Sequence, residues 1–271
     1  MIARRGSAFY ACGVVAAAEQ SWPSLLWLIR HGESAGNVAR DAAEAAGTPV
    51  IDIAHRDVDV PLSPLGERQS VSLGHWFGEQ PESRKPTVIL TSPYVRALQT
   101  TELLVQAAKL TDAPIHRFVD ERLREKEFGV LNRLTKAGII AQYPREAELR
   151  AHIGKFYYRP PGGESWCDVI LRLRSVMDHI QLQYAGERVL IVAHQVVVLC
   201  LRYLLEHMTE HAILRIDAEK DVANCAVTAY ECVRDESGRV GMALRLYNHV
   251  TPMLEEGTAV TTEPDARVAP R

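Results

Sequence analysis

The sequence predicts an α/β fold, a single domain in which helices cover both faces of a mainly parallel sheet as a three-layer αβα sandwich. Two observations predict it. Short apolar runs rich in β-branched residues alternate with longer amphipathic segments, as expected for parallel strands joined by crossover helices. A hairpin pattern follows near the C-terminus and adds an antiparallel element to the sheet. The 271 residues, 47% of them hydrophobic, are enough to build one large core.

Apolar runs bounded by turn residues mark the expected strands. Four of them are expected to be parallel, the first and the fourth of them buried, and two later runs, joined through Asp235-Glu236-Ser237-Gly238, form the hairpin. The expected strands span residues 25–30, 87–90, 115–119, 189–193, 226–233 and 241–247.

Capping residues locate the expected helices. Ser63 precedes a proline at the first helical position, Gly47 stops the first helix, and Ser165 with Asp168 forms a capping box before a strong apolar stripe that stops at Gly186. Besides the helix that begins after Ser165, the expected helices span residues 35–46, 64–78, about 95–109, 135–143, 146–153 and 196–207.

Composition divides the chain into three parts. Residues 1–24 carry two early arginines and a small apolar run, which resembles a secretory signal peptide but is interpreted as a disordered extension or a misplaced start. Residues 25–250 are expected to form the folded domain. Residues 251–271 are polar and contain proline, so this tail is expected to be disordered.

Charge and cysteine content limit the function classes. The formal net charge of −3 gives no electrostatic footprint for nucleic acid, and no apolar run is long enough to span a membrane. Five cysteines without a closely spaced pair indicate reduced thiols, and hence a cytoplasmic protein. Export is the alternative if residues 1–24 act as a signal peptide.

The end of the first strand carries the strongest functional signal. An apolar run stops at Arg30-His31-Gly32, and Ser34 follows where a helix can begin. Ligands bind at the carboxyl ends of strands in open α/β sheets, and a helix N-terminus there favours an anion. Arg30 adds a forked cation, so His31 is a candidate nucleophile or acid/base beside a phosphate.

Other predicted strands end in the same way. Arg96 lies in the first helical turn after the second strand, His194 directly follows the fourth, and Glu125 lies in a charged loop after the third. Because parallel strands place their carboxyl ends at one edge of the sheet, these groups are expected to meet around one anion.

Five sequence blocks then resemble the histidine phosphatase superfamily, the phosphoglycerate mutase-like proteins. The resemblance covers residues 25–250, with the blocks in the family's order. The blocks are Leu28-Ile29-Arg30-His31-Gly32-Glu33-Ser34-x-x-Asn37, Ser92-Pro93-x-x-Arg96-Ala97-x-Gln99-Thr100, Leu123-Arg124-Glu125-x-x-x-Gly129, Pro161-Gly162-Gly163-Glu164-Ser165 and Val192-Ala193-His194.

The resemblance implies a role for each site residue. His31 would attack as a neutral imidazole and become a phosphohistidine. Glu125 would protonate the leaving oxygen and then activate water, with Glu127 as the rival carboxylate. His194 would donate a proton and positive charge. The groups that would hold the phosphoryl oxygens are Arg30, Arg96, His194, Asn37 and backbone N–H groups. The resemblance implies no metal and no cofactor.

Departures from the family pattern indicate the substrate. The insert typical of mutases is missing, which favours hydrolysis over phosphoryl transfer. Several positions resemble the fructose-2,6-bisphosphatase branch, but Leu199 and Gly162 replace two cations of that branch, so a smaller phosphomonoester is expected rather than a sugar bisphosphate. The candidate substrate-binding residues are Ser34, Asn37, Tyr143, Arg159 and Gln195. A small phosphorylated substrate is the expected partner, and a homodimer is left open.

Two other classes of protein compete with this interpretation. The stretch from His207 to His211 has the His-x-x-Glu-His spacing of inverted zinc peptidases, although it falls where a helix ends and lacks a third ligand. A phospho-ligand-binding module without catalysis would use the same anion pocket. The presence of two histidines and Glu125 favours the enzyme.

Overall fold

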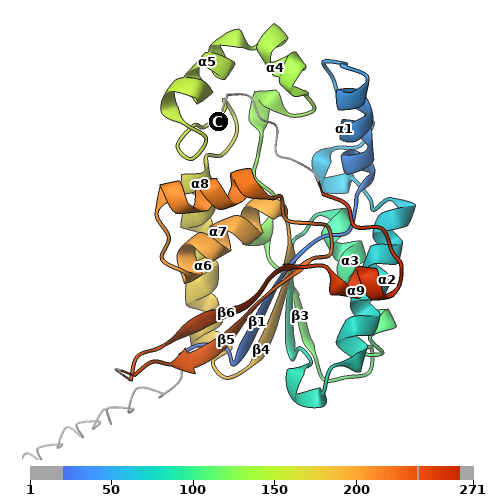
Figure 1. The fold of residues 1–271 in the computed structure, drawn as a ribbon, viewed down its shortest axis with the longest axis vertical. Helices are drawn as coiled ribbons and strands as arrows, with labels where there is room; N and C mark the ends of the chain where they lie inside the picture. Colours follow the sequence, from blue (N-terminus) through green and yellow to red (C-terminus); the bar gives the residue numbers. More distant parts are fainter. Residues whose placement is uncertain (1–20, 237, 263–271) are drawn as a thin grey trace, which may run out of the picture.

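The computed structural model describes residues 21–262 except residue 237. A six-stranded sheet lies between two layers of helices, as predicted, in the strand order β3-β2-β4-β1-β5-β6 (Figure 1). β1 to β4 are parallel, whereas β5 pairs antiparallel with β1 and with β6. The strands are β1 (Leu25–Arg30), β2 (Val88–Thr91), β3 (His116–Val119), β4 (Arg188–Ala193), β5 (Val227–Arg234) and β6 (Val240–His249).

Helices connect the strands and cover the sheet. The helices are α1 (Ala35–Ala45), α2 (Pro64–Glu79), α3 (Val95–Ala107), α4 (Lys136–Gln142), α5 (Pro144–Ile153), α6 (Trp166–Gln183), α7 (Gln195–Leu205), α8 (Glu210–Glu219) and α9 (Thr251–Glu255). The layer of α6, α7 and α8 packs on one face, and that of α2, α3 and α9 on the other (Figure 1). The segment with α1 and the segment with α4 and α5 lie beyond the carboxyl ends of the parallel strands.

Strand β1 is buried on both faces, as its unbroken apolar run predicts. Leu26 and Leu28 enter the core shared with α6 and α7, whereas Trp27 and Ile29 enter the core shared with α2 and α3. Side chains alternate between the faces of a sheet, so a strand between two helical layers must be apolar at every position. This central place fixes the position of the residues directly after β1.

The predicted caps are present. The Ser63 side chain accepts a hydrogen bond from the backbone of Gly66 at the start of α2, and Ser165 and Asp168 form the reciprocal capping box of α6.

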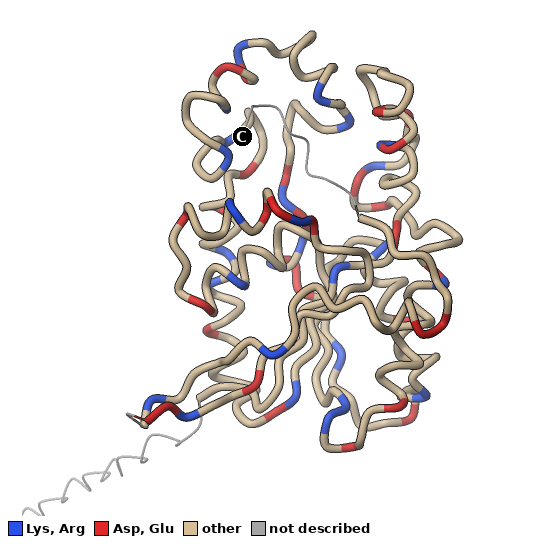
Figure 2. Tube along the Cα trace, viewed as in Figure 1, with Lys and Arg blue, Asp and Glu red and all other residues tan. Residues whose placement is uncertain are grey.

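Lysine and arginine residues are interspersed with acidic residues along the trace (Figure 2). Within residues 21–262 other than 237, no helix combines the length and the apolar character needed to cross a bilayer.

The expectation of a disordered tail from residue 251 is wrong for residues 251–262. Met253 of α9 is fully buried against the α2–α3 side of the core, and the Oγ atoms of Thr258 and Ser72 lie 2.8 Å apart. A few apolar residues are enough to order this segment because they pack on a surface that α2 already provides. Composition alone does not reveal that surface. Residues 263–271, and residues 1–20 of the expected extension, lie outside the described residues.

Helix α8 lies in a segment for which no helix was expected. The Thr209 side chain caps its start by accepting a hydrogen bond from the backbone of Ala212. The His-x-x-Glu-His stretch is therefore divided, because His207 follows the end of α7 with a φ of 49° and His211 lies inside α8. No cluster of metal-ligating side chains occurs among the residues that the structure describes.

Candidate active site

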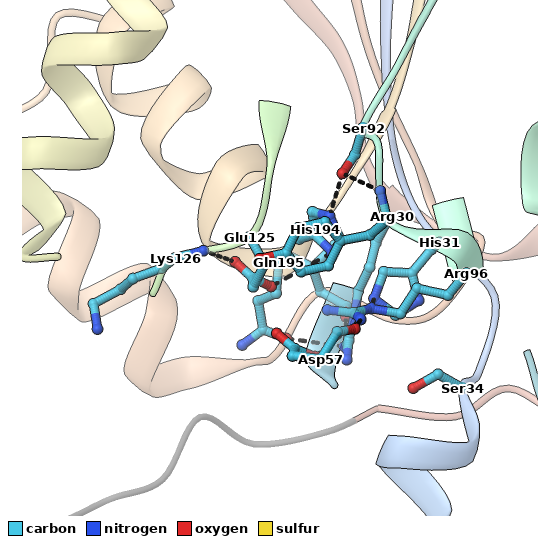
Figure 3. Close-up of polar contacts among 12 residues, drawn as sticks. Arg30, His31, Ser34, Asp57, Ser92, Arg96, Glu125, Lys126, His194 and Gln195 are labelled. Carbon is cyan, nitrogen blue, oxygen red and sulfur yellow. Dashed lines mark hydrogen bonds and ion pairs between the residues drawn. The ribbon is translucent and has the colours of Figure 1, made fainter. Parts of the chain in front are cut away.

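The ends of β1, β2 and β4 bring the first functional side chains together. Backbone hydrogen bonds tie His31 N to Ala193 O at 2.9 Å and Ser92 N to Val192 O at 3.0 Å. The ring centroids of His31 and His194 lie 5.1 Å apart (Figure 3). Residues more than 160 positions apart therefore share one site because their strands are parallel neighbours.

Hydrogen bonds define which nitrogen of His31 can attack. Nδ1 lies 2.7 Å from the carbonyl oxygen of Gly32, which can only accept, so Nδ1 carries the proton. The Nε2 lone pair then accepts from Arg96 Nε at 3.2 Å. Burial, followed by the charges of Arg96 and Arg30, lowers the pKa of His31 well below its usual value. The neutral form of the imidazole is therefore favoured, and its Nε2 lone pair is directed toward Arg96.

Gly32 permits the close packing that holds this loop. A Cβ at Gly32 would lie 2.5 Å from the carbonyl oxygen of Gly66 in α2, which no real side chain tolerates. The N–H of Gly32 donates to Thr100 Oγ1 at 3.0 Å. Helices α2 and α3 thus fix the turn that carries His31.

Arg96 is fixed by a residue outside the predicted site. Its Nη1 donates to Asp57 Oδ1 at 3.0 Å and to the Asp57 carbonyl at 2.7 Å. Only 6% of the Arg96 side chain is exposed. Asp57 belongs to residues 48–61, a stretch without periodicity, so the sequence offered no specific signal for this carboxylate.

His194 is held by Ser92. Its Nε2 lies 2.7 Å from Ser92 Oγ, which also accepts from the backbone N–H of Tyr94 at 3.4 Å. If the Ser92 hydroxyl donates to Nε2, the N–H of His194 is at Nδ1, 3.7 Å from Glu125 Oε2. Burial, and then Arg96, lowers the pKa of His194 well below its usual value, which disfavours its charged form.

Glu125 lies beside His194 at the pocket wall. Burial raises its pKa to about 7, although the backbone N–H of Lys126, which donates to Oε1 at 2.8 Å, opposes the shift. Figure 3 shows the Lys126 side chain directed away from the Glu125 carboxylate. The rival Glu127 instead accepts a hydrogen bond from the Tyr94 hydroxyl at 3.0 Å and does not line the pocket.

Arg30 and Gln195 form a connected pair on the pocket wall. Arg30 Nη1 donates to Gln195 Oε1 at 2.9 Å and to the carbonyl of Val222 at 2.5 Å. Gln195 Nε2 in turn donates to Asp221 Oδ1 at 3.1 Å. Gln195, expected to bind substrate, therefore uses both ends of its amide to orient the guanidinium.

Ser34 and Asn37 line the pocket and also cap α1. Asn37 Oδ1 accepts from Ser34 N at 2.8 Å, and Ser34 Oγ accepts from Asn37 N at 3.1 Å. Because the amide oxygen is engaged in this cap, its orientation leaves the NH₂ group as the end of Asn37 available to an anion.

Tyr143 and Arg159, two of the expected substrate-binding residues, do not line the pocket. Tyr143 packs against a small cluster near α4 that includes Tyr158, and Arg159 forms an ion pair with Asp168 of the α6 capping box. Short motif matches placed them in the site, whereas the packing of Tyr143 in this cluster and the ion pair of Arg159 with Asp168 hold them outside the pocket lining.

The lining of the pocket comes from separate parts of the chain. Segments 51–60 and 128–133 contribute walls that the sequence did not predict in detail. The residues that line it are Arg30, His31, Ser34, Gly36, Asn37, Arg40, Ile51, Ile53, His55, Asp57, Val60, Arg96, Phe128, Asn132, Arg133, Gln195, Val196 and Glu125.

Together, the fold and the site define an α/β protein with two buried imidazoles, two guanidinium groups and a carboxyl group around one anion-sized pocket. The family model of the histidine phosphatase superfamily (branch 1) matches residues 26–243. The chain belongs to this superfamily, and it is an enzyme of the phosphatase class.

Similar proteins include both mutases and phosphatases. A 2,3-bisphosphoglycerate-dependent phosphoglycerate mutase 2 of Gloeobacter violaceus is 30% identical over 210 residues, which cover 77% of this chain and 85% of that protein. The 6-phosphofructo-2-kinase/fructose-2,6-bisphosphatase 3 of Bos taurus is 30% identical over 204 residues, 72% of this chain but 38% of that protein. The chain therefore spans little more than a third of that bifunctional relative.

Solved structures share the fold. A mycobacterial glucosyl-3-phosphoglycerate phosphatase, described as a complex with VO3, has a TM-score of 0.63 and 26% identity, and the match covers 84% of this chain and 100% of that one. A structure described as mycobacterial hydrolase 1 also gives a TM-score of 0.63 at 26% identity, over 83% of this chain and 98% of that one.

Proposed function

We propose that this protein hydrolyses phosphomonoesters without a metal ion, through a phosphohistidine on His31. In the first step, His31 Nε2 attacks phosphorus and an N–P bond forms while the ester P–O bond breaks. The leaving oxygen takes the proton of Glu125, whose pKa of about 7 keeps much of it protonated at neutral pH.

In the second step, the Glu125 carboxylate takes a proton from water, and the water oxygen bonds to phosphorus. The N–P bond breaks, inorganic phosphate leaves, and Glu125 is protonated again for the next cycle. Arg30, Arg96 and His194 stabilise the negative charge on the oxygens in both steps. A bound phosphate dianion also favours the charged form of His194, which gives it the donor role.

One observation carries the proposal: His31 is fixed as a neutral imidazole whose Nε2 faces Arg96, with Nδ1 bound to the Gly32 carbonyl. A histidine with a purely structural role does not require a guanidinium group directed at its free lone pair. A phosphate bound beside the His31 imidazole and the Arg96 guanidinium would interact with both groups.

Trapping the intermediate tests this proposal. We expect acid-labile, alkali-stable radiolabel on the wild-type protein after brief reaction with a ³²P-labelled phosphomonoester and alkaline quench. His31→Ala should remove both the label and turnover, whereas His116→Ala, at an exposed strand position, should keep both. Turnover by His31→Ala within tenfold of wild type would contradict the mechanism. Unchanged turnover in EDTA tests metal independence.

Phosphoryl transfer between hydroxyls is the second candidate, and the similarity to a phosphoglycerate mutase over 85% of that relative favours it. Both reactions pass through the same phosphohistidine, so they differ only in the acceptor that reaches it. The ratio of inorganic phosphate released to phosphoryl group transferred to an added alcohol distinguishes them, and we expect hydrolysis to dominate.

A further inference from the structure

Glu164 is a buried carboxylate to which the proposed reaction gives no role. It belongs to the sequence block from Pro161 to Ser165, and it is not among the described residues that line the active-site pocket. A charged side chain is seldom buried unless hydrogen bonds and opposite charges satisfy it. Two donors to this carboxylate lie in residues 122–129, which we call the acid segment because they include Glu125.

The Glu164 carboxylate accepts hydrogen bonds from both sides of Glu125. Arg124 Nη2 donates to Oε1 at 2.8 Å, and the backbone N–H of Glu127 donates to Oε2 at 3.1 Å. The backbone N–H of Glu164 donates in turn to the Glu127 carbonyl at 2.9 Å. The residue before Glu125 and the second residue after it are therefore tied to one side chain.

Arg172 of α6 binds the same carboxylate and the same segment. Its Nε and Nη2 donate to Oε1 and Oε2 of Glu164 at 3.0 and 3.1 Å, the bidentate geometry of a guanidinium and a carboxylate. Nη2 also donates to the Glu125 carbonyl at 3.3 Å, and Nη1 donates to the Arg122 carbonyl. The side chains of Arg172 and Glu164 are 10% and 12% exposed. One buried ion pair thus binds the backbone at positions 122, 125 and 127.

The acid segment is also held at its C-terminal end. Gly129 has a φ of 53°, and a Cβ there would lie 2.1 Å from the carbonyl oxygen of Pro161, so only glycine fits. The next backbone N–H, that of Val130, donates to the same carbonyl at 3.0 Å. The backbone that carries Glu125 is therefore fixed by the block from Pro161 to Ser165 and by α6.

Geometry decides whether Glu125 can act as the acid. Its Oε1 accepts from the backbone N–H of Lys126 at 2.8 Å, and its Oε2 lies 3.7 Å from His194 Nδ1. A general acid must come within about 3 Å of the leaving oxygen, and a displacement of about 1 Å can cost on the order of 100-fold in rate. The backbone around Glu125 must therefore be held in place during the reaction.

We propose that Glu164 and Arg172 are positioning residues for Glu125: their ion pair fixes the acid segment so that the carboxyl stays buried beside the leaving oxygen. This inference rests on the proposed hydrolysis. Neither residue is among the described residues that line the pocket, so both act through Glu125. The pair should therefore matter for substrates whose leaving group needs a proton and much less for those whose leaving group does not.

Leaving-group dependence tests this role. Glu164→Gln and Arg172→Gln should each lower kcat/KM for an alkyl phosphate at least tenfold but that for 4-nitrophenyl phosphate less than threefold, because nitrophenolate leaves without protonation. Arg172→Lys keeps the charge but not the forked donors, so its alkyl kcat/KM should lie between those of Arg172→Gln and wild type. Arg174→Gln removes an exposed charge from the same helix and should leave both values unchanged.

The pH profile is a readout that a loss of stability alone would not move. The charged and titratable groups that face or act on Glu125 include His194, Arg96, Arg30 and Asp57. The substitutions leave all of these groups in place. A loosened acid segment would admit water to the Glu125 carboxyl and lower its pKa from about 7 toward its ordinary value. We therefore expect the fall of alkyl kcat/KM with rising pH to begin about one unit lower in Glu164→Gln than in wild type.

A double variant separates positioning from stability. Removal of one member of a buried ion pair leaves the other charge unpaired and lowers stability, whereas replacement of both by neutral residues is often close to neutral. Glu164→Gln combined with Arg172→Met should therefore regain most of the Tm that Glu164→Gln loses, yet keep the low ratio of alkyl to aryl kcat/KM. A ratio that recovered together with the Tm would show that the pair serves stability alone, which would overturn the inference.

The outcomes also separate this inference from the proposed function. A wild-type alkyl-to-aryl ratio in both single variants, with hydrolysis that still requires His31, would overturn the positioning role and leave the catalytic mechanism intact. Hydrolysis by His31→Ala at the wild-type rate would instead contradict the mechanism, and the positioning role with it.

Discussion

Burial shifts the pKa values of His31 and Glu125 in opposite directions and favours the neutral form of both groups. Removal from water disfavours whichever form is charged, so the pKa of the imidazole falls and that of the carboxyl rises to about 7. The proposed first step requires a neutral imidazole as the nucleophile and a protonated carboxyl as the acid. One physical cause, desolvation of a shared pocket, therefore prepares both reactants.

Replacing Glu125 should affect substrates according to their leaving groups. We expect Glu125→Gln to lower kcat/KM for an alkyl phosphate about 100-fold or more but that for 4-nitrophenyl phosphate less than tenfold, because a good leaving group needs little protonation. The measurement is kcat/KM, which reports on formation of the phosphohistidine. Glu127→Gln is the matched control, and equal losses on both substrates would remove Glu125 from the acid role.

The pH profile should follow the same carboxyl. Glu125 must be protonated to act as the acid, so kcat/KM for an alkyl phosphate should fall as pH rises through about 7, about tenfold per unit. The pKa of His31 is lowered, so the nucleophile stays neutral across this range. The check is the ratio of alkyl to aryl kcat/KM between pH 6 and 9. A flat ratio would be inconsistent with this assignment.

At the scale of elements, the positions of the strand ends depend on helices that lie away from the pocket. Helix α6 begins at a capping box and places one apolar face, including Leu173, on the sheet face that carries Leu26 and Leu28. This packing holds β1 and β4 side by side and so sets the distance between the two imidazoles. The opposite face of α6 is solvated.

Two leucines of α6 compare its buried face with its solvated face. Leu173 is fully buried and Leu171 is 65% exposed. We expect Leu173→Ala to lower the free energy of unfolding by about 2–5 kcal/mol, because it leaves a cavity, and Leu171→Ala by less than about 1 kcal/mol. Urea denaturation followed by circular dichroism measures both. Similar losses for the two variants would mean that α6 does not pack as described.

At the scale of the whole molecule, the C-terminal segment supports the first strand's loop. Thr261 Oγ1 donates to Asn224 Oδ1 at 3.0 Å, and Asn224 Nδ2 donates to the carbonyl of His31 at 2.9 Å. Gln69 of α2 links the two segments, because its Nε2 donates to Thr261 Oγ1 at 2.9 Å and its Oε1 accepts from Glu33 N at 2.8 Å. The last described residues are therefore part of the domain.

Adjacent residues of α9 test this role. Met253 is fully buried, whereas Leu254 is 62% exposed. Met253→Ala should lower the free energy of unfolding by about 2–5 kcal/mol and Leu254→Ala by less than about 1 kcal/mol. Thermal unfolding of the two proteins provides the comparison. If Met253→Ala were as stable as wild type, the tail would not be part of the core.

The sequence by itself determined the α/β architecture and most element positions. Apolar periodicity and capping residues such as Ser63 and Ser165 act within a few residues, so they can be interpreted without the rest of the chain. Helix α8 and the packed α9 were missed, because their short apolar faces become favourable only against surfaces formed by distant elements.

Only the tertiary structure decided how the candidate site is arranged. It supplied Asp57 beside Arg96 and Ser92 beside His194, and it placed Tyr143 and Arg159 outside the pocket. The pKa of Glu125 also follows from burial among segments far apart in the chain. Local sequence fixes which groups are present, whereas contacts and desolvation between distant segments fix what each group can do.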